Sequence, residues 1–313
     1  MPAILTHYIA GQCVLKRLPL EIIKRIQPYE PLYNLGTQGP DIFFYYIRGA
    51  MRKPLQGIGS YMHQNDLGHF LVQLAREAKA ASLLPFAEFV YAAGFIMHYL
   101  VDSYTHPYVY AKTEKSGASK IKNSTDHHEF ETAIDIAMLQ LYDGNKPADY
   151  ELWHLINAED MDYAAEATSR AICAVYGRQI SAKDVENAML CMVKIVRLIQ
   201  SRRGWRKKIL GLAEKLILGH PLNSSIIHGQ SIDNSIDYLN EKKRPWQAPW
   251  ENSARTDSFL DLFQAAVDEG VQLVQTLHGY IYEGLPIEAL QEKLGNRSLK
   301  TGQECGTEPC EPS

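Results

Sequence analysis

Three side chains that can bind a metal interrupt an apolar stretch at an even spacing of four residues: His98, Asp102 and His106. The surrounding run from Pro85 to Ala111 is rich in apolar and aromatic residues, which predicts a buried helix. Residues four apart share one helix face and lie about 6 Å apart along its axis. A carboxylate in such a helix costs several kcal/mol unless it is paired or binds a cation. A metal ion at Asp102 is one interpretation of this pattern; a hydrogen-bonded core histidine and a surface pair four residues apart are the others, and the rest of the chain must decide between them.

A second pair with the same spacing, His127 and Glu131, lies further along the chain, and His128 offers an alternative partner for Glu131. Upstream candidates are the following: His7, Asp41 and His63, with His69 as the alternative to His63. Asp41 follows a proline and precedes the aromatic run 42–46, so a helix N-cap is its alternative role.

These candidates are imidazoles and carboxylates, and no cysteine lies near them in the sequence. Such a donor set suits Zn²⁺ in hydrolytic sites and can also suit Mn or Fe. The candidates exceed what one tetrahedral ion needs, so we expect two or three ions. Asp102 is well placed to bridge them, because a histidine lies one helical turn to either side.

The composition is that of an ordinary globular protein. The chain has 313 residues, of which 46% are hydrophobic and 22% charged, and its net charge is −4. This charge predicts no general attraction to nucleic acid or to anionic membranes. Residues 1–10 carry no basic segment typical of a signal peptide, and no apolar run approaches the length of a transmembrane helix. The five scattered cysteines match no disulfide framework or zinc ribbon, so we expect a cytoplasmic protein with reduced thiols.

The periodicity predicts an all-α protein, with no strand-like alternation. Helices are expected at 20–26, 60–81, 85–111, 124–142, 148–157, 161–176, 182–201, 204–218, 258–282 and 287–294. Loops are expected at 27–41, 114–123 and 219–252. Residues 1–145 are predicted to form the core with the candidate ligands, 146–296 to add helices packed on the same domain, and 297–313 to be a disordered tail. The basic residues from Arg197 to Lys208 indicate a solvated helix end or a contact with acidic headgroups or phosphate.

Together the candidates resemble the zinc-dependent phospholipase C family of bacteria, whose all-helical fold also resembles that of the single-strand-specific zinc nucleases. The motifs that carry the resemblance cover roughly residues 1–142. They are Thr6-His7, Gly39-Pro40-Asp41, His63, His98-Tyr99-Leu100-x-Asp102 with His106-Pro107, and His127-x-x-x-Glu131.

The resemblance implies a particular division of ligands among the zinc ions. One ion would be held by the following residues: Asp41, His63, His98 and Asp102. A second would be held by His106, His127 and Glu131. A third would be held by His7, Asp102 and the N-terminus. The secreted enzymes begin with a tryptophan that binds the third zinc, whereas this chain begins with Met1-Pro2.

The chemistry expected of such a site is phosphodiester hydrolysis. Paired metal ions lower the pKa of a bridging water to about 7 and stabilise both the attacking and the leaving oxygen. The resemblance implies that Asp41 is both a ligand and the proton acceptor near this water. We expect a phospholipase C that acts on a phosphodiester small molecule or a phospholipid headgroup. The alternatives are a nuclease or nucleotidase with the same site, and a non-catalytic protein stabilised by metal.

Overall fold

The computed structural model describes residues 4–46, 53–81, 85–114, 120–144, 151–199 and 232–305. Over these ranges the chain is all-α, as predicted, and no β-strand forms; two isolated bridges join Trp246 to Arg255 and Arg297 to Glu304. None of the described helices has the length and apolar character needed to cross a membrane.

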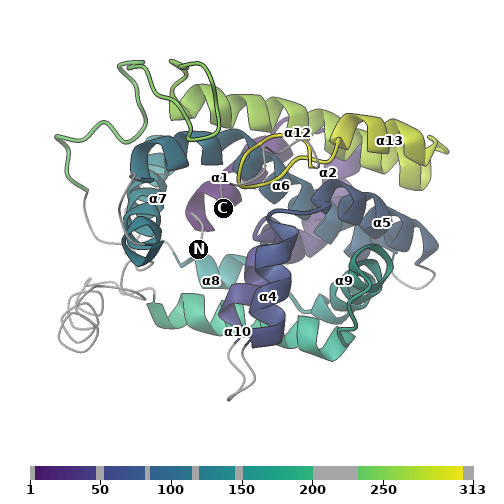
Figure 1. Ribbon diagram of the computed structural model, residues 1–313. Coiled ribbons are helices and arrows are strands. Elements are labelled where there is room, and N and C mark those ends of the chain that lie inside the picture. Colours follow the sequence, from purple (N-terminus) through teal and green to yellow (C-terminus); the bar gives the residue numbers. More distant parts are fainter. Residues whose placement is uncertain are drawn as a thin grey trace.

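The elements follow one another around a central helix, α6 (Figure 1). The α-helices are α1 (Ile4–Leu15), α2 (Leu20–Ile26), α3 (Glu30–Gly36), α4 (Lys53–Met62), α5 (Leu67–Ala80), α6 (Pro85–Thr113), α7 (Lys120–Asp143), α8 (Leu152–Leu155), α9 (Met161–Tyr176), α10 (Ala182–Ile199), α12 (Phe259–Tyr282) and α13 (Ile287–Leu294). Two 3₁₀ helices, η1 (Gln27–Tyr29) and η2 (Gly39–Tyr45), flank α3.

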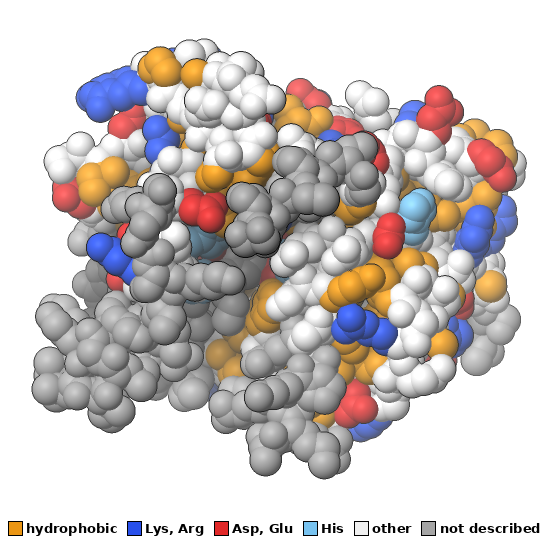
Figure 2. Space-filling view, in the orientation of Figure 1, with side chains coloured by type: hydrophobic (Ala, Val, Ile, Leu, Met, Phe, Trp, Pro, Cys, Tyr) orange, Lys and Arg blue, Asp and Glu red, His pale blue; other side chains and the backbone are white. Residues whose placement is uncertain are grey.

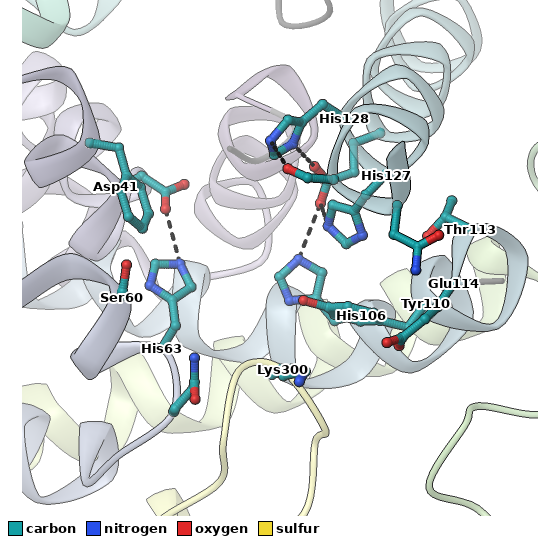
Figure 3. A pocket seen from close by; sticks show the side chains of 15 residues that line it. Asp41, Ser60, His63, His106, Tyr110, Thr113, Glu114, His127, His128 and Lys300 are labelled. Carbon is teal, nitrogen blue, oxygen red and sulfur yellow. Dashed lines mark hydrogen bonds and ion pairs between the residues drawn. The ribbon is translucent and has the colours of Figure 1, made fainter. Parts of the chain in front are cut away.

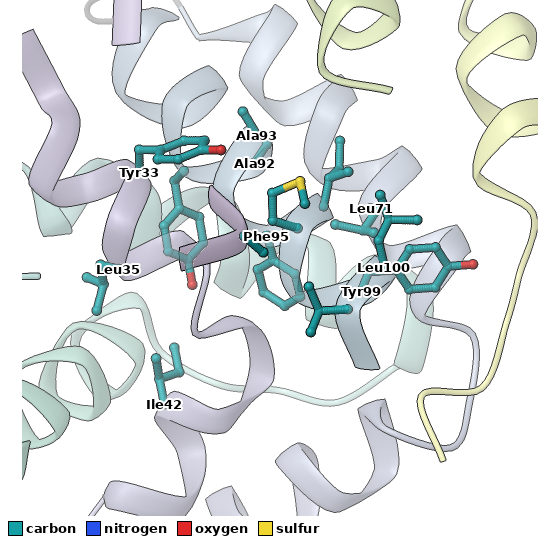
Figure 4. Close-up of a cluster of buried hydrophobic side chains, with 14 of the residues drawn as sticks. Tyr33, Leu35, Ile42, Leu71, Ala92, Ala93, Phe95, Tyr99 and Leu100 are labelled. Atoms are coloured by element: carbon teal, nitrogen blue, oxygen red, sulfur yellow. The ribbon is translucent and has the colours of Figure 1, made fainter. Parts of the chain in front are cut away.

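Helix α6 is mostly apolar apart from the face with the candidate ligands and is covered by α1, α3, α5, α7 and α12, as expected of a helix that lies inside a protein. Phe95, Tyr99 and Leu100 of this helix are fully buried. They pack in the core with residues of α3 and α5, such as Tyr33 and Leu71 (Figure 4). The core therefore surrounds the helix that carries the first three candidate ligands.

Two close approaches bring α3 and the chain after it against α6. A Cβ atom on Gly94 of α6 would clash with the carbonyl oxygen of Tyr33. A Cβ atom on Gly39 would clash with the ring of His98, and Gly39 also has a positive φ of +52°, a conformation that favours glycine. These glycines allow η2, and with it Asp41, to lie directly on the face of α6 that carries the candidate ligands.

The prediction of a loop at 27–41 is wrong, because most of this segment is helical. Pro28, Pro31 and Pro40 each occupy one of the first two positions of a short helix. Proline is tolerated there because these N–H groups have no partner within the helix. The prolines therefore begin helices in this segment.

The single helix predicted at 60–81 is divided into α4 and α5. Asp66 lies at the junction with a positive φ of 51°, which changes the direction of the chain. As a result His63 and His69 lie on separate elements, and their side chains do not share a helix face.

Further differences concern helix boundaries. The N-terminal segment forms α1, and α7 begins at Lys120, so the predicted linker at 114–123 is partly helical. Of the helix predicted at 148–157, the described part forms only α8. The helix predicted at 204–218 and the basic residues after Arg197 lie outside the described residues.

The expectation of a disordered tail from residue 297 is wrong for residues 297–305, which pack on the domain. Leu299 is 0% exposed, and the hydroxyl of Tyr99 in α6 accepts a 2.8 Å hydrogen bond from the backbone N–H of Arg297. The same hydroxyl donates to the carbonyl oxygen of Leu294. Residues 306–313 lie outside the described residues.

Candidate metal centre

The structure brings all eight candidate ligands to one place between α1, η2, α4, α6 and α7. His7 comes from α1, Asp41 from η2, and His63 directly follows α4. The remaining candidates come from the two long helices: His98, Asp102 and His106 from α6, and His127 and Glu131 from α7.

Asp102 lies at the centre of the cluster and is 2% exposed. Its Oδ1 atom is 3.1 Å from Nε2 of His7 and 3.6 Å from Nε2 of His106. Its Oδ2 atom is 3.2 Å from Nε2 of His98 and 3.9 Å from Nε2 of His63. Four imidazoles therefore point their Nε2 atoms at the two oxygens of one carboxylate.

Around this carboxylate the ligand atoms form three groups, each with its atoms within 4.8 Å of one another. The groups are His7–His98–Asp102, Asp41–His63–His98 and His106–His127–Glu131. In the second group, Oδ1 of Asp41 is 3.0 Å from Nε2 of His63. In the third, Oε1 of Glu131 is 3.2 Å from Nε2 of His106 and 3.0 Å from Nε2 of His127 (Figure 3).

The outer nitrogens of three histidines are held by backbone carbonyl groups. Nδ1 of His63 donates to Gly59 over 2.8 Å, Nδ1 of His98 to Thr37 over 3.2 Å, and Nδ1 of His106 to Leu299 over 2.7 Å. A carbonyl oxygen only accepts hydrogen bonds, so Nδ1 carries the proton in each case. The Nε2 atoms of these histidines face the centre, which is the arrangement typical of metal-ligating histidines.

Several buried polar atoms at the centre have no hydrogen-bond donor. They are both carboxylate oxygens of Asp41, Nε2 of His98, Oδ2 of Asp102 and Oε2 of Glu131. Lone pairs that face one another in a buried site repel, and an unpaired buried carboxylate costs several kcal/mol. Cations between these atoms would remove both penalties, so the donor set fits bound metal ions.

The electrostatics keep the carboxylates ionised. Burial alone would raise the pKa of Asp102, but the neighbouring imidazoles, above all His106 and His98, hold it well below its usual range. His127 and His106 likewise outweigh burial and keep the pKa of Glu131 low. For His106, burial lowers the pKa, but the charges of Asp102 and Glu131 prevail and raise it to about 9. The centre thus combines ionised carboxylates, which attract cations, with imidazoles that bind a metal ion once their Nε2 atoms are deprotonated.

The structure distinguishes between the pairs of candidates that the sequence left open. The His69 side chain is 53% exposed and contacts Asp66, with 3.2 Å between Nδ1 and Oδ1; His63 is the histidine in the cluster. His128 lies further from Glu131 than His127 does, with 3.7 Å between Nδ1 and Oε2, and its Nε2 is 3.2 Å from Oγ of Ser124.

The N-cap interpretation of Asp41 does not match its position. Asp41 lies inside η2, whose N-cap residue is Gln38, and its carboxylate points at His63 (Figure 3). The aromatic run after it is divided between two roles. Phe44 lines the pocket beside the cluster, whereas Phe43, Tyr45 and Tyr46 belong to the hydrophobic core.

Asp135 is a residue of the site that the sequence analysis missed. It is fully buried in α7, and its carboxylate accepts hydrogen bonds from the backbone N–H groups of Leu5 (3.0 Å) and Thr6 (2.7 Å) and from the Thr6 hydroxyl (2.6 Å). These bonds satisfy free donors at the start of α1 and fix the turn that carries His7. The signal was present, because Asp135 continues the four-residue spacing of His127 and Glu131.

A pocket of about 480 Å³ opens above the cluster. Figure 2 shows histidine and acidic side chains within a hollow on this face of the molecule. The pocket is lined on one side by Asp41, Ser60 and His63 and on the other by Tyr110, Glu114, His127, His128 and Lys300 (Figure 3). Phe44 also lines it, with its ring 5.3 Å from that of His63. A ligand in this pocket would contact members of two of the three groups.

Comparison with known families agrees with this geometry. A family model described as zinc dependent phospholipase C matches residues 6–179, which is more than half of the chain and includes all eight candidate ligands. No curated protein and no solved structure matches the chain significantly.

Proposed function

Because the chain belongs to the zinc-dependent phospholipase C family, we propose that it hydrolyses phospholipid-type phosphodiesters at the cluster around Asp102. The observation that carries the proposal is the set of Nε2 atoms, from four histidines, that face the carboxylate of Asp102 within 3.9 Å. This arrangement is costly without cations and favourable with them. That the protein is cytoplasmic remains a prediction from the sequence.

Each of the three groups is proposed to hold one zinc ion. One ion would lie between Asp41, His63 and His98, and a second between His106, His127 and Glu131; a third would lie near His7 and Asp102, because the one free nitrogen of His98 binds a single ion. The central position of Asp102 suits a bridging role. When bound, the ions would supply Lewis-acid activation of a water and stabilisation of negative charge on the phosphate.

Within this scheme the chain itself positions the substrate and accepts a proton. Asp41 lines the pocket, and neither of its oxygens has a hydrogen-bond donor. One oxygen faces His63, which leaves the other to accept the proton of the attacking water. Asp41 is therefore the proposed catalytic residue. The ring of Phe44, on the same side of the pocket, offers an apolar contact to the part of the substrate next to the scissile bond.

Metal analysis and a substrate screen test the proposal. The purified protein is expected to contain at least two zinc equivalents, and a protein without bound metal contradicts the proposal. The zinc-loaded protein is expected to hydrolyse a chromogenic phosphocholine ester or a phospholipid and to leave single-stranded DNA intact. Cleavage of DNA without cleavage of either ester would favour the nuclease alternative.

Asp102→Asn provides the site-specific test, with His69→Asn as the matched control. The Asp102 variant is expected to lose zinc and activity, because an amide is a poor bridging ligand. The control changes an exposed histidine outside the cluster and is expected to keep both. An Asp102 variant that retains its full zinc content would show that Asp102 is no ligand.

A further inference from the structure

One wall of the pocket comes from a part of the chain that the family model does not match. Residues 296–305, here called the C-terminal strap, lie along one side of the pocket next to α6 (Figure 3), whereas the matched region ends at residue 179. The strap brings Lys300 into the lining of the pocket. The family match therefore does not account for this part of the pocket.

The strap is fastened to the cluster through its backbone. The N–H group of Leu299 donates to the carbonyl oxygen of His63 over 2.9 Å, and the carbonyl oxygen of Leu299 accepts from Nδ1 of His106 over 2.7 Å. On the other side of Lys300, the carbonyl oxygen of Thr301 accepts a 3.2 Å hydrogen bond from Nε1 of Trp250. The backbone is thus held on both sides of Lys300.

A close contact with α6 fixes the strap further. Pro107 has no N–H group, so the carbonyl of Ser103, four residues earlier, lacks its usual helical partner. Gly302 of the strap lies against this carbonyl with a φ of +70°, and a Cβ atom at this position would clash with the Ser103 oxygen. The N–H of Gly302 also donates to Ser298 over 2.9 Å. The strap therefore presents the Lys300 side chain from a defined backbone position.

Lys300 lies on the side of the pocket formed by the His106–His127–Glu131 group. Its Nζ atom is 5.7 Å from the ring centroid of Tyr110, and this ring is 4.7 Å from that of His127. Of the side chains that line the described pocket, Lys300 is the one lysine or arginine. An ammonium group offers three hydrogen-bond donors and a compact positive charge, which suits oxygen anions.

We propose that Lys300 selects substrates by charge, by binding an anionic group such as a carboxylate or second phosphate next to the scissile phosphodiester. The inference rests on the proposed function and names its substrate class. A quaternary ammonium headgroup such as choline is recognised by aromatic faces and acidic groups, and Lys300 repels it. Glu114 would act against this selection, because it also lines the pocket and its negative charge would attract a cationic headgroup.

Two p-nitrophenyl phosphodiesters test the proposal, one with choline as the second ester group and one with a carboxyethyl group. Lys300→Met is expected to lower the preference for the carboxyethyl ester, measured as the ratio of kcat/KM values, about tenfold, the effect of losing one charge-assisted hydrogen bond. Lys300→Arg keeps the charge and is expected to keep the preference. Lys293→Met is the control, because Lys293 hydrogen-bonds Thr276 away from the pocket.

Binding of inorganic phosphate to the zinc-loaded protein, measured by calorimetry, gives a readout that does not depend on turnover. Lys300→Met is expected to weaken phosphate binding about tenfold. If phosphate affinity and ester preference are both unchanged, the proposal is overturned. A weaker affinity in a protein that hydrolyses neither ester would support the anion site while contradicting the proposed function. If Glu114→Gln alone changes the preference, selection belongs to Glu114 and the proposal fails.

Discussion

The imidazole of His106 donates a 2.7 Å hydrogen bond from Nδ1 to the carbonyl oxygen of Leu299, a residue 193 positions further along the chain. This bond fixes the tautomer of His106 and points its Nε2 toward Asp102 and Glu131. Loss of the hydrogen-bond partner of a metal-ligating histidine typically lowers the metal affinity 10–100-fold. The C-terminal strap is thus part of the candidate metal centre even though it contributes none of the candidate ligand atoms.

Substitution of Gly302 by Ala should displace the strap and loosen His106. The new Cβ atom meets the Ser103 oxygen, and the positive φ adds strain of about 1 kcal/mol or more. Zinc titration is expected to show at least tenfold weaker binding at one site. Gly284→Ala is the matched control, because Gly284 has a φ of +79° but open space around it. The interpretation is wrong if both variants bind zinc equally well.

Substitution of Asp135 by Asn should destabilise the start of α1. The carboxylate accepts hydrogen bonds from the backbone N–H groups of Leu5 and Thr6. In the Asn variant, an NH₂ group takes the place of one of these oxygens, so that two donors face each other and one hydrogen bond is lost. Denaturant unfolding is expected to show a loss of about 1–2 kcal/mol, the range for a lost helix cap. Asp261→Asn changes a more exposed cap in α12 and should cost less. A larger loss in the Asp261 variant would contradict the role of Asp135.

Chelation of the metal should lower the unfolding temperature. Without cations the orphaned oxygens of Asp41, Asp102 and Glu131 remain buried next to one another, and ligands that bind only the native state stabilise it by mass action. Scanning calorimetry with and without EDTA is expected to show a fall that added zinc reverses, whereas magnesium does not. An unchanged transition in EDTA, with zinc shown by analysis to be removed, would mean that the cluster is stable without metal.

Glu88, in the first turn of α6, should make stability depend on pH. It is 4% exposed, its Oε2 has no hydrogen-bond partner, and burial raises its pKa. The buried side chain favours the folded state when it is protonated. This contribution to stability is fully present below the ordinary pKa of a glutamate, near 4.5, and is lost as the pH rises through the raised pKa of Glu88 in the folded protein. Glu88→Gln is expected to raise the unfolding free energy by about 1 kcal/mol at pH 7 and to have little effect at pH 4.

The control for Glu88→Gln is Glu77→Gln. Glu77 accepts a 2.6 Å hydrogen bond from Arg170, so its substitution should lower stability slightly at neutral pH, by less than about 1 kcal/mol. Denaturant unfolding of both variants from pH 4 to pH 8 checks the signs. If Glu88→Gln destabilises the protein at pH 7, the carboxylate of Glu88 has a favourable partner and the argument from burial fails.

The sequence by itself determined the parts of the site that depend on helix periodicity. The four-residue spacing of His98, Asp102 and His106 requires a shared face once the segment is helical. The same holds for His127 and Glu131, and their relation does not depend on how the two helices pack. The all-α class followed from the same local pattern.

The tertiary structure decided which distant residues join these two helices. Helix α4 ends at Met62, and the left-handed backbone of Asp66 at the N-cap of α5 separates His63, which faces the cluster, from the exposed His69. Close packing at Gly39 brings Asp41 against α6, and the strap brings the Leu299 carbonyl to His106. These relations depend on backbone dihedrals and on contacts between residues far apart in the chain, which local spacing does not encode.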